Sequence, residues 1–350
     1  MGLENIVGEY SQKTITQRYE LIAALTRKFG EGRRVSSTKE EWEFQCPLCK
    51  HPSHLHISLS NGFFVCVTPG CLYKGHISSL LRVKTEIKVP EPVPLDYERL
   101  TNVYTQVISL GTLRASHRRW LEKRGICPTI TPFISSDSLV GKVNKLPKED
   151  LEYAGLTSES GLLSAILGMN RVILPYIQRD TGKVEYIRGR TLNLEEKPKY
   201  LSPRGISALS FTYGWHLVDI SKDYMVITEG EFKALAALQL GINCVGLPGM
   251  SISHKKAAEM CKQFGFKTVY VLFDSEVDVV NGIPKQEIVD TAANKLANCL
   301  KQQGISVYIA KLPTTNGVSE KIDIDTFILQ KGADAKSELL VTLQMAKQVK

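Results

Sequence analysis

The sequence predicts an α/β protein in three parts: a small cysteine-rich β module, a basic α+β region, and a domain built on a parallel sheet. Two cysteine pairs flank a hairpin signal between residues 46 and 71. Basic and aromatic residues are concentrated between residues 171 and 204. From residue 223 onward, short apolar runs alternate with amphipathic segments. This alternation is the pattern of parallel strands that are covered by helices on both faces.

Length and composition indicate a globular protein with a basic surface. A chain of 350 residues, 43% of them hydrophobic, has room for two or three domains with buried cores. Its formal net charge of +8 fits a nucleic-acid partner. The first residues lack the features of a secretory signal, and no apolar run reaches the roughly 18 residues of a membrane span. We therefore expect a cytoplasmic protein with no membrane partner, whose cysteines stay reduced.

Changes of composition divide the chain into five segments. Apolar residues recur at helical spacing within residues 12–30, which predicts an amphipathic helix. The segment KTEIKVPEPVPLDYE contains three prolines and scattered charges, which favours an extended linker. The expected segments are a helix with the cysteine-rich module, the linker, the basic region, the parallel-sheet domain, and an acidic motif with a helical tail, over residues 1–83, 84–99, 100–220, 221–315 and 316–350.

Four cysteines of the first module have the spacing of zinc ligands: Cys46, Cys49, Cys66 and Cys71. They form two pairs on either side of a hairpin that turns at Asn61-Gly62. A hairpin with a ligand pair at each end is a zinc ribbon with tetrahedral thiolate coordination. The alternative is four cysteines in a small apolar core, but a module of about 40 residues can hardly fold without a metal ion or a disulfide. We expect one structural zinc per chain, with His51 as the substitute ligand should Cys49 not bind.

The basic residues of the middle region fall on a predicted hairpin that turns at residues 180–183. Arg188 and Arg190 alternate onto one face of a strand, a geometry suited to successive phosphates. Lys199 and Tyr200 follow, and together they offer a charge for the backbone and a ring for a base, as a single-stranded template requires. The alternative is a solvated charged face.

Three groups of acidic residues follow predicted strands, where the chemistry of parallel sheets is found. The groups are Glu229; Asp274, Glu276 and Asp278; and Asp323 and Asp325. Residues 274 and 276 lie on the same side of an extended chain, so their carboxylates can share a hard metal ion. Each group by itself could be a solvated cap. Three groups at one sheet edge favour a metal site suited to phosphoryl transfer.

The order of these motifs resembles the DnaG-type primases of bacteria and phages. The run RVILPYI, followed by GR, PKYLSPR and Tyr213-Gly214, resembles the basic part of their RNA polymerase core, and WLEKRGI resembles the helix before it. The end of the cysteine-rich module, GCLYKGHISSLL, resembles that of their zinc-binding domain. The resemblance covers roughly residues 40–335.

The last part of the chain resembles TOPRIM, a Rossmann-like parallel-sheet domain. The matching segments are EGEFKALAALQLGINCVGLPG and VLFDSEVD. The sequence departs from the TOPRIM pattern at Lys233, where primases often have an acid, at Glu276, where a second aspartate is usual, and after the acidic triplet, where no glycine follows. Compared with the DnaG-type primases, Cys49 of the zinc-binding module stands where a histidine is usual, and Ser202 of the basic region stands where an asparagine is usual.

The resemblance implies a DNA-directed RNA polymerase that makes short RNA primers on single-stranded DNA by two-metal-ion nucleotidyl transfer. Glu229, Asp274 and Glu276 would be catalytic and would bind magnesium or manganese, and Asp278, Asp323 and Asp325 would assist. The expected nucleic-acid or nucleotide contacts are Arg124, Arg171, Arg188, Arg190, Lys199, Tyr200 and Lys233. Ribonucleoside triphosphates and a separate hexameric helicase would be partners. The alternatives are a TOPRIM phosphodiesterase or nuclease, and a non-catalytic adaptor that binds single-stranded DNA.

Overall fold

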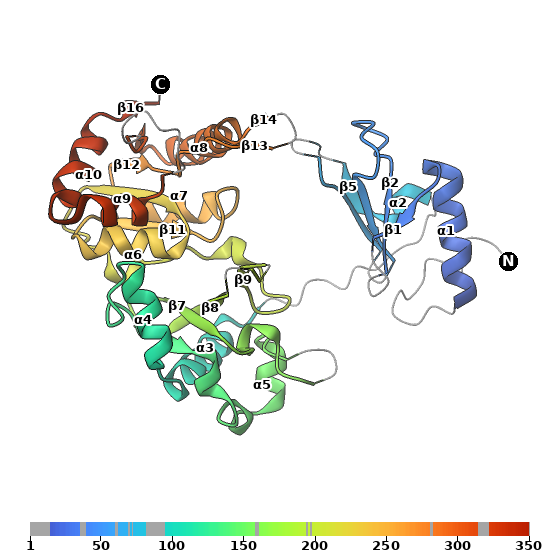
Figure 1. Ribbon diagram of the computed structural model, residues 1–350, viewed down its shortest axis with the longest axis horizontal. Coiled ribbons are helices and arrows are strands. Elements are labelled where there is room, and N and C mark those ends of the chain that lie inside the picture. Colours follow the sequence, from blue (N-terminus) through green and yellow to red (C-terminus); the bar gives the residue numbers. More distant parts are fainter. Residues whose placement is uncertain are drawn as a thin grey trace. The chain divides into compact units, whose positions relative to one another are not determined.

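The computed structural model describes residues 15–35, 40–59, 62–68, 71, 73–81, 95–157, 161–193, 195–196, 198–280, 283–313 and 322–349. Most of the predicted linker and Asn61 of the predicted turn lie outside these residues. The chain forms two units, Met1–Pro94 and Leu95–Lys350, whose elements are labelled in Figure 1. The division between the units falls within the predicted linker, and the other expected boundaries stay predictions.

The first unit is a small antiparallel sheet with a helix before and after it. Its elements are α1 (Ile15–Phe29), β1 (Arg33–Arg34), β2 (Glu41–Phe44), β3 (Leu55–Ser58), β4 (Phe63–Cys66), β5 (Lys74–His76) and α2 (Ile77–Leu81). The five strands pair in sequence order. Leu21 and Leu25 of α1 are fully buried in one core with Ile57 of the sheet. Strands β3 and β4 form the predicted hairpin, with Leu55 opposite Cys66.

The second unit begins with an antiparallel sheet in the order β6-β7-β8-β9. The elements of this region are α3 (Tyr97–Leu110), α4 (Ala115–Lys123), β6 (Ile134–Ser135), α5 (Lys148–Tyr153), β7 (Arg171–Ile177), β8 (Val184–Thr191) and β9 (Tyr200–Leu201). Strands β7 and β8 form the predicted basic hairpin, with Leu174 opposite Arg188. Tyr104 of α3 packs edge-on against Tyr186 of β8, and both rings are fully buried. Helix α3 therefore anchors one face of the hairpin.

The rest of the second unit is the expected parallel sheet. Its strands are β10 (Tyr224–Glu229), β11 (Cys244–Leu247), β12 (Thr268–Val271), β15 (Ser306–Ile309) and the antiparallel β16 (Lys347–Gln348). Its helices are α6 (Glu231–Gln239), α7 (His254–Gln263), α8 (Lys285–Lys301), α9 (Ile324–Lys331) and α10 (Ala335–Gln344). A ribbon of β13 (Val279–Val280) and β14 (Ile283–Pro284) precedes α8. Short 3-10 helices span Ser136–Leu139, Val143–Lys145, Ala165–Leu167, Ala208–Ser210, Trp215–Leu217 and Gly332–Asp334.

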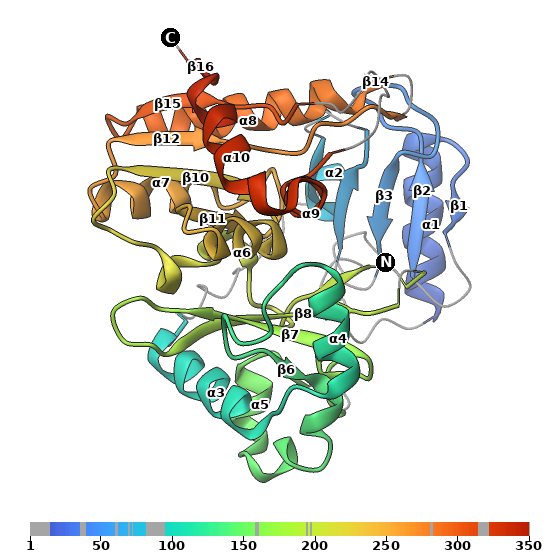
Figure 2. The ribbon, with the colours of Figure 1, turned by 60° about the vertical axis from the view of Figure 1, so that its left-hand side comes forward.

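Helices cover the parallel sheet on both faces, as Figure 2 shows. Helices α7 and α8 pack on one face, where Ile227 and Val269 are fully buried. Helices α6, α9 and α10 pack on the other, against Val226 and Leu272. This double cover explains why the strands are apolar at successive positions, because residues of both faces are buried. Among the helices of the described residues, none is long and apolar enough to cross a membrane.

The order of the parallel strands places the acidic residues. The sheet runs β11-β10-β12-β15, so the chain moves to one side from β10 to β11 and to the other side afterwards. Beyond the carboxyl ends of β10 and β12 the connections therefore diverge, and such switch points are where open α/β sheets bind ligands. Glu229 is the last residue of β10, and Asp274 lies three residues after the end of β12.

Candidate active site and zinc centre

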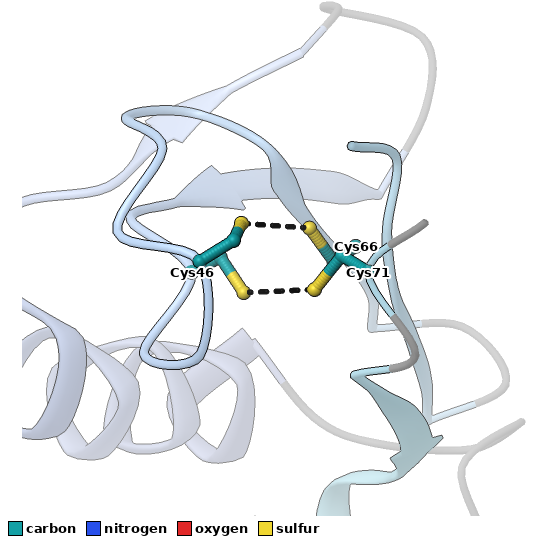
Figure 3. A group of neighbouring side chains, drawn as sticks. Cys46, Cys66 and Cys71 are labelled. Carbon is teal, nitrogen blue, oxygen red and sulfur yellow. Dashed lines mark hydrogen bonds between the residues drawn. The ribbon is translucent and has the colours of Figure 1, made fainter. Parts of the chain in front are cut away.

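The four predicted zinc ligands meet in the first unit. Their sulfur atoms all lie within 4.8 Å of one another. The Sγ atoms of Cys46 and Cys71 are 3.8 Å apart and those of Cys49 and Cys66 are 3.6 Å apart, and Figure 3 shows these two contacts as dashed lines. A tetrahedral zinc with bonds of about 2.3 Å separates its sulfur ligands by about 3.8 Å. The cysteines therefore fit a zinc ion.

Thr68 and His54 support the cysteine cluster from outside. The Thr68 hydroxyl lies 3.3 Å from the Sγ atoms of both Cys49 and Cys66, and 2.8 Å from Nδ1 of His54. The Thr68 hydrogen bond lowers the pKa of Cys49 to about 6, which favours the thiolate that binds zinc. His51 stacks on His54 with the ring centres 4.6 Å apart and does not belong to the ligand group. The four-cysteine set is thus the one that the described residues bring together.

Replacing Cys49 by alanine is expected to reduce zinc content well below one ion per chain, because three thiolates leave the tetrahedral site open. Metal analysis of the purified protein measures this. Cys127→Ala is the matched control, since Cys127 is an exposed cysteine of the second unit. His51→Ala should also keep its zinc. Full zinc in Cys49→Ala, lost only when His51 is removed as well, would contradict the four-cysteine set.

Glu229 and Asp274 face a lysine at the switch point. Helix α6 follows β10 after Gly230, whose φ of +87° favours glycine. One turn into the helix, the Lys233 ammonium donates to both carboxylate oxygens of Asp274, at 2.5 and 2.6 Å, and lies 3.9 Å from Oε1 of Glu229. Asp274 is 3% exposed. The switch point therefore holds a largely buried cation between two acidic residues.

A second lysine contacts the other two acids of the triplet. Lys285, at the start of α8, donates to Oδ2 of Asp278 at 2.5 Å and lies 3.9 Å from Oε2 of Glu276. The backbone N–H of Glu276 donates to Oε1 of Gln286 at 2.9 Å, which fixes the chain after β12 against α8. Among the described residues, no three carboxylates approach as closely as the four cysteines do. Instead, Lys233 contacts Glu229 and Asp274, and Lys285 contacts Glu276 and Asp278.

Asp323 and Asp325 are brought to this edge by a backbone bridge. Ser275 and Ile322 exchange both N–H···O bonds, at 3.0 and 3.1 Å. Asp323 then caps α9 by accepting from the N–H of Thr326, and Asp325 forms an ion pair with Arg124. Burial raises the pKa of Asp325 to about 6, although the Arg124 guanidinium acts in the opposite direction. Arg124, expected at a template, is thus engaged by one of the expected metal-site acids.

The arginines of the basic hairpin are stacked with aromatic rings. Arg188 and Arg190 lie against Tyr200, 4.6 and 5.1 Å from its ring centre. Arg190 also faces Trp120 at 5.8 Å, and Trp120 faces Arg124 at 5.4 Å. The expectation that residues 188 and 190 share a face of β8 is confirmed. We call these five side chains the guanidinium–aromatic stack.

Most of the expected nucleic-acid contacts are less exposed than a groove lining would be. Arg171 is 5% exposed and forms an ion pair with Glu196, and Arg190 is 4% exposed and donates to the carbonyl of Thr191. Lys199, by contrast, is exposed. Of these basic side chains, Lys199 is the one best placed to reach a phosphate.

Glu231 is a site residue that the sequence analysis missed. It is fully buried, and its Oε1 accepts from Nη1 of Arg188 and from the hydroxyl of Tyr176, each at 2.6 Å. Arg188 also donates to the carbonyl of Pro248 at 3.0 Å. This buried ion pair ties the basic hairpin to the first turn of α6. The one feature of the sequence that could have pointed to Glu231 is its position two residues after Glu229.

Comparisons with known proteins show which structures this fold resembles. Residues 215–335 match a family described as a domain of unknown function, DUF3854. No match was found among curated proteins. The zinc-binding and RNA polymerase domains of the Aquifex aeolicus primase align with a TM-score of 0.55 and 20% identity, over 95% of this chain and 86% of theirs.

Two further structures are primase fragments. The RNA polymerase domain of Mycobacterium tuberculosis primase DnaG aligns with a TM-score of 0.57 and 16% identity, over 71% of this chain and 84% of that one. The primase fragment of the bacteriophage T7 primase-helicase aligns at a TM-score of 0.36 and 14% identity, over 86% and 98%, which is too distant to support a conclusion. The protein therefore has the fold of the zinc-binding and RNA polymerase domains of bacterial primases.

Proposed function

We propose that the protein is a DNA primase, a nucleotidyltransferase that makes short RNA primers from ribonucleoside triphosphates on single-stranded DNA during replication. The observation that carries the proposal is the position of Glu229 and Asp274. In a chain with the primase fold, Glu229 ends and Asp274 follows the two strands that border the switch point of the parallel sheet. The parallel sheet would then be a TOPRIM domain. A separate hexameric helicase is the partner that the resemblance implies.

Glu229, Asp274 and Glu276 are proposed to hold magnesium or manganese. Carboxylate oxygens are the donors that these ions prefer, and a cation already lies between Glu229 and Asp274 in the form of Lys233. When bound, such ions neutralise phosphate charge and lower the pKa of a coordinated hydroxyl. Asp278, Asp323 and Asp325 would surround the same edge, with Asp325 kept in place by Arg124.

The basic side chains would have two tasks. Lys199 would neutralise a template phosphate, because it is exposed. Arg188 and Arg190 would position the Tyr200 ring between them, since each is already engaged within the protein. Lys199 precedes Tyr200 in sequence, so its charge would hold a single strand close to the guanidinium–aromatic stack.

Lys199→Ala is expected to weaken binding to single-stranded DNA and to reduce the salt dependence by about 0.7 in the slope of log K against log salt, the value for one lost phosphate contact. Fluorescence anisotropy at several salt concentrations measures both. Lys183→Ala is the control: it removes the same charge from an exposed lysine at the turn end of β8, about 25 Å away along the strand. Equal slopes for wild type and Lys199→Ala would assign Lys199 to the solvated surface.

Labelled ribonucleotides on single-stranded templates of varied sequence test the proposed function. Short RNA products that depend on template sequence and on a divalent metal would support a primase. Degradation of labelled DNA under the same conditions would favour the phosphodiesterase or nuclease. Binding of the template with neither product would favour the non-catalytic adaptor.

A further inference from the structure

Lys233 bears on how many metal ions the acidic edge binds. We propose that its ammonium takes the place of one divalent ion, so that the second unit binds a single ion where the resemblance implies two. The inference rests on the proposed function for the identity of the site. It concerns ion number, which is measured without nucleotide or template.

The geometry of Lys233 is that of a bound cation. Its Nζ contacts both oxygens of Asp274, at 2.5 and 2.6 Å, as a metal does when a carboxylate binds it with both oxygens. The same Nζ is 3.9 Å from the nearest oxygen of Glu229. The two acids come from the ends of adjacent strands, β10 and β12, and the lysine comes from the helix between β10 and β11. The fold therefore builds the ammonium into the position between them.

Burial makes this cation hard to displace. The Lys233 side chain is 12% exposed and that of Asp274 is 3% exposed. A divalent ion that bound both oxygens of Asp274 would leave the ammonium buried beside a second, like charge, which is unfavourable in a poorly solvated site. Lys285 differs, because its partner Asp278 is 58% exposed and either side chain can turn into solvent.

Counting bound Mn²⁺ by electron paramagnetic resonance, on the zinc-loaded full chain, tests the proposal. Wild type is expected to bind one Mn²⁺. Lys233→Gln is expected to bind a second, at least tenfold more tightly than wild type does. Lys255→Gln is the matched control, because Lys255 pairs with Glu259 at 3.8 Å on the exposed face of α7 and should leave the count at one. The double variant Lys233→Gln with Asp274→Asn should lose the second ion again.

Two tightly bound Mn²⁺ in wild type would overturn the proposal, and this result does not depend on any variant folding. No Mn²⁺ in wild type, or a single ion in Lys233→Gln that melts as a folded protein, would overturn it as well. If the wild type binds two ions and also synthesises primers, the one-ion proposal is wrong and the proposed primase activity is supported. One ion without primer synthesis would keep the role of Lys233 and refute the primase.

Discussion

Asp274→Asn is expected to lower primer synthesis by roughly 10³-fold or more, the largest effect of any single substitution in this chain. Asp274 holds a cation with both of its oxygens, and an amide offers neither the charge nor the second acceptor that an ammonium or a hard metal ion needs. Loss of the charge therefore removes the cation from the switch point. Incorporation of labelled ribonucleotide, with magnesium and then with manganese, measures the effect.

The stability of this variant should also fall, by about 3 kcal/mol, because Lys233 would lose its buried partner. From the sequence alone, clustered carboxylates predict little change or a slight gain in stability; the Lys233 ion pair reverses that expectation. A thermal melt establishes that the assayed protein is folded. Glu259→Gln, which removes the exposed partner of Lys255 on α7, is the control and should keep full activity. Wild-type activity in Asp274→Asn would place the chemistry elsewhere.

Glu231→Gln is expected to destabilise the second unit by about 3 kcal/mol. Glu231 is fully buried and accepts hydrogen bonds from Arg188 and Tyr176, so the neutral amide leaves the Arg188 guanidinium without a compensating charge. Urea unfolding measures the change as a lower midpoint. The matched control is Glu259→Gln, since Glu259 pairs with exposed Lys255 at 3.8 Å and should contribute less than about 0.5 kcal/mol.

A double variant shows how much of the lost stability comes from the Arg188–Glu231 ion pair and how much comes from packing. Arg188→Met combined with Glu231→Gln removes both charges, and it should recover part of the lost stability because no unpaired charge stays buried. If the loss of unfolding free energy in the double variant equals the sum of the losses in Arg188→Met and in Glu231→Gln, the two side chains are not coupled. Packing then accounts for the loss.

The parts of this structure that sequence could predict are those fixed by local chemistry. The zinc ligands were predictable because ligand spacing and hairpin pairing lie within one short segment. Glu229 and Asp274 were predictable as neighbours because parallel strands end at one edge of a sheet. The shared face of Arg188 and Arg190 followed from the alternation of side chains along a strand. In the last two cases a strand end or the two-residue repeat of a strand decides the outcome.

The ion pairs could not be predicted, because their partners are far apart in sequence. Lys233 and Asp274 are separated by 41 residues, and Arg188 and Glu231 by 43. Each pair forms because α6 lies next to both sheets, with Phe232 packed into the core of the basic region. A pattern of charges does not contain this information. For the same reason, basic residues expected on a surface proved to be buried.

The guanidinium–aromatic stack has a mechanical consequence. At one end Arg188 bonds to Glu231 in α6, and at the other end Arg124 bonds to Asp325 in α9. Tyr200 and Trp120 fill the spaces between the charges. The two sheets of the second unit therefore cannot slide past each other without exposing rings and breaking both ion pairs. A template phosphate held by Lys199, next to Tyr200, would then lie at a distance from the acidic edge that the fold sets, and the reactants would need no closing motion within this unit to align.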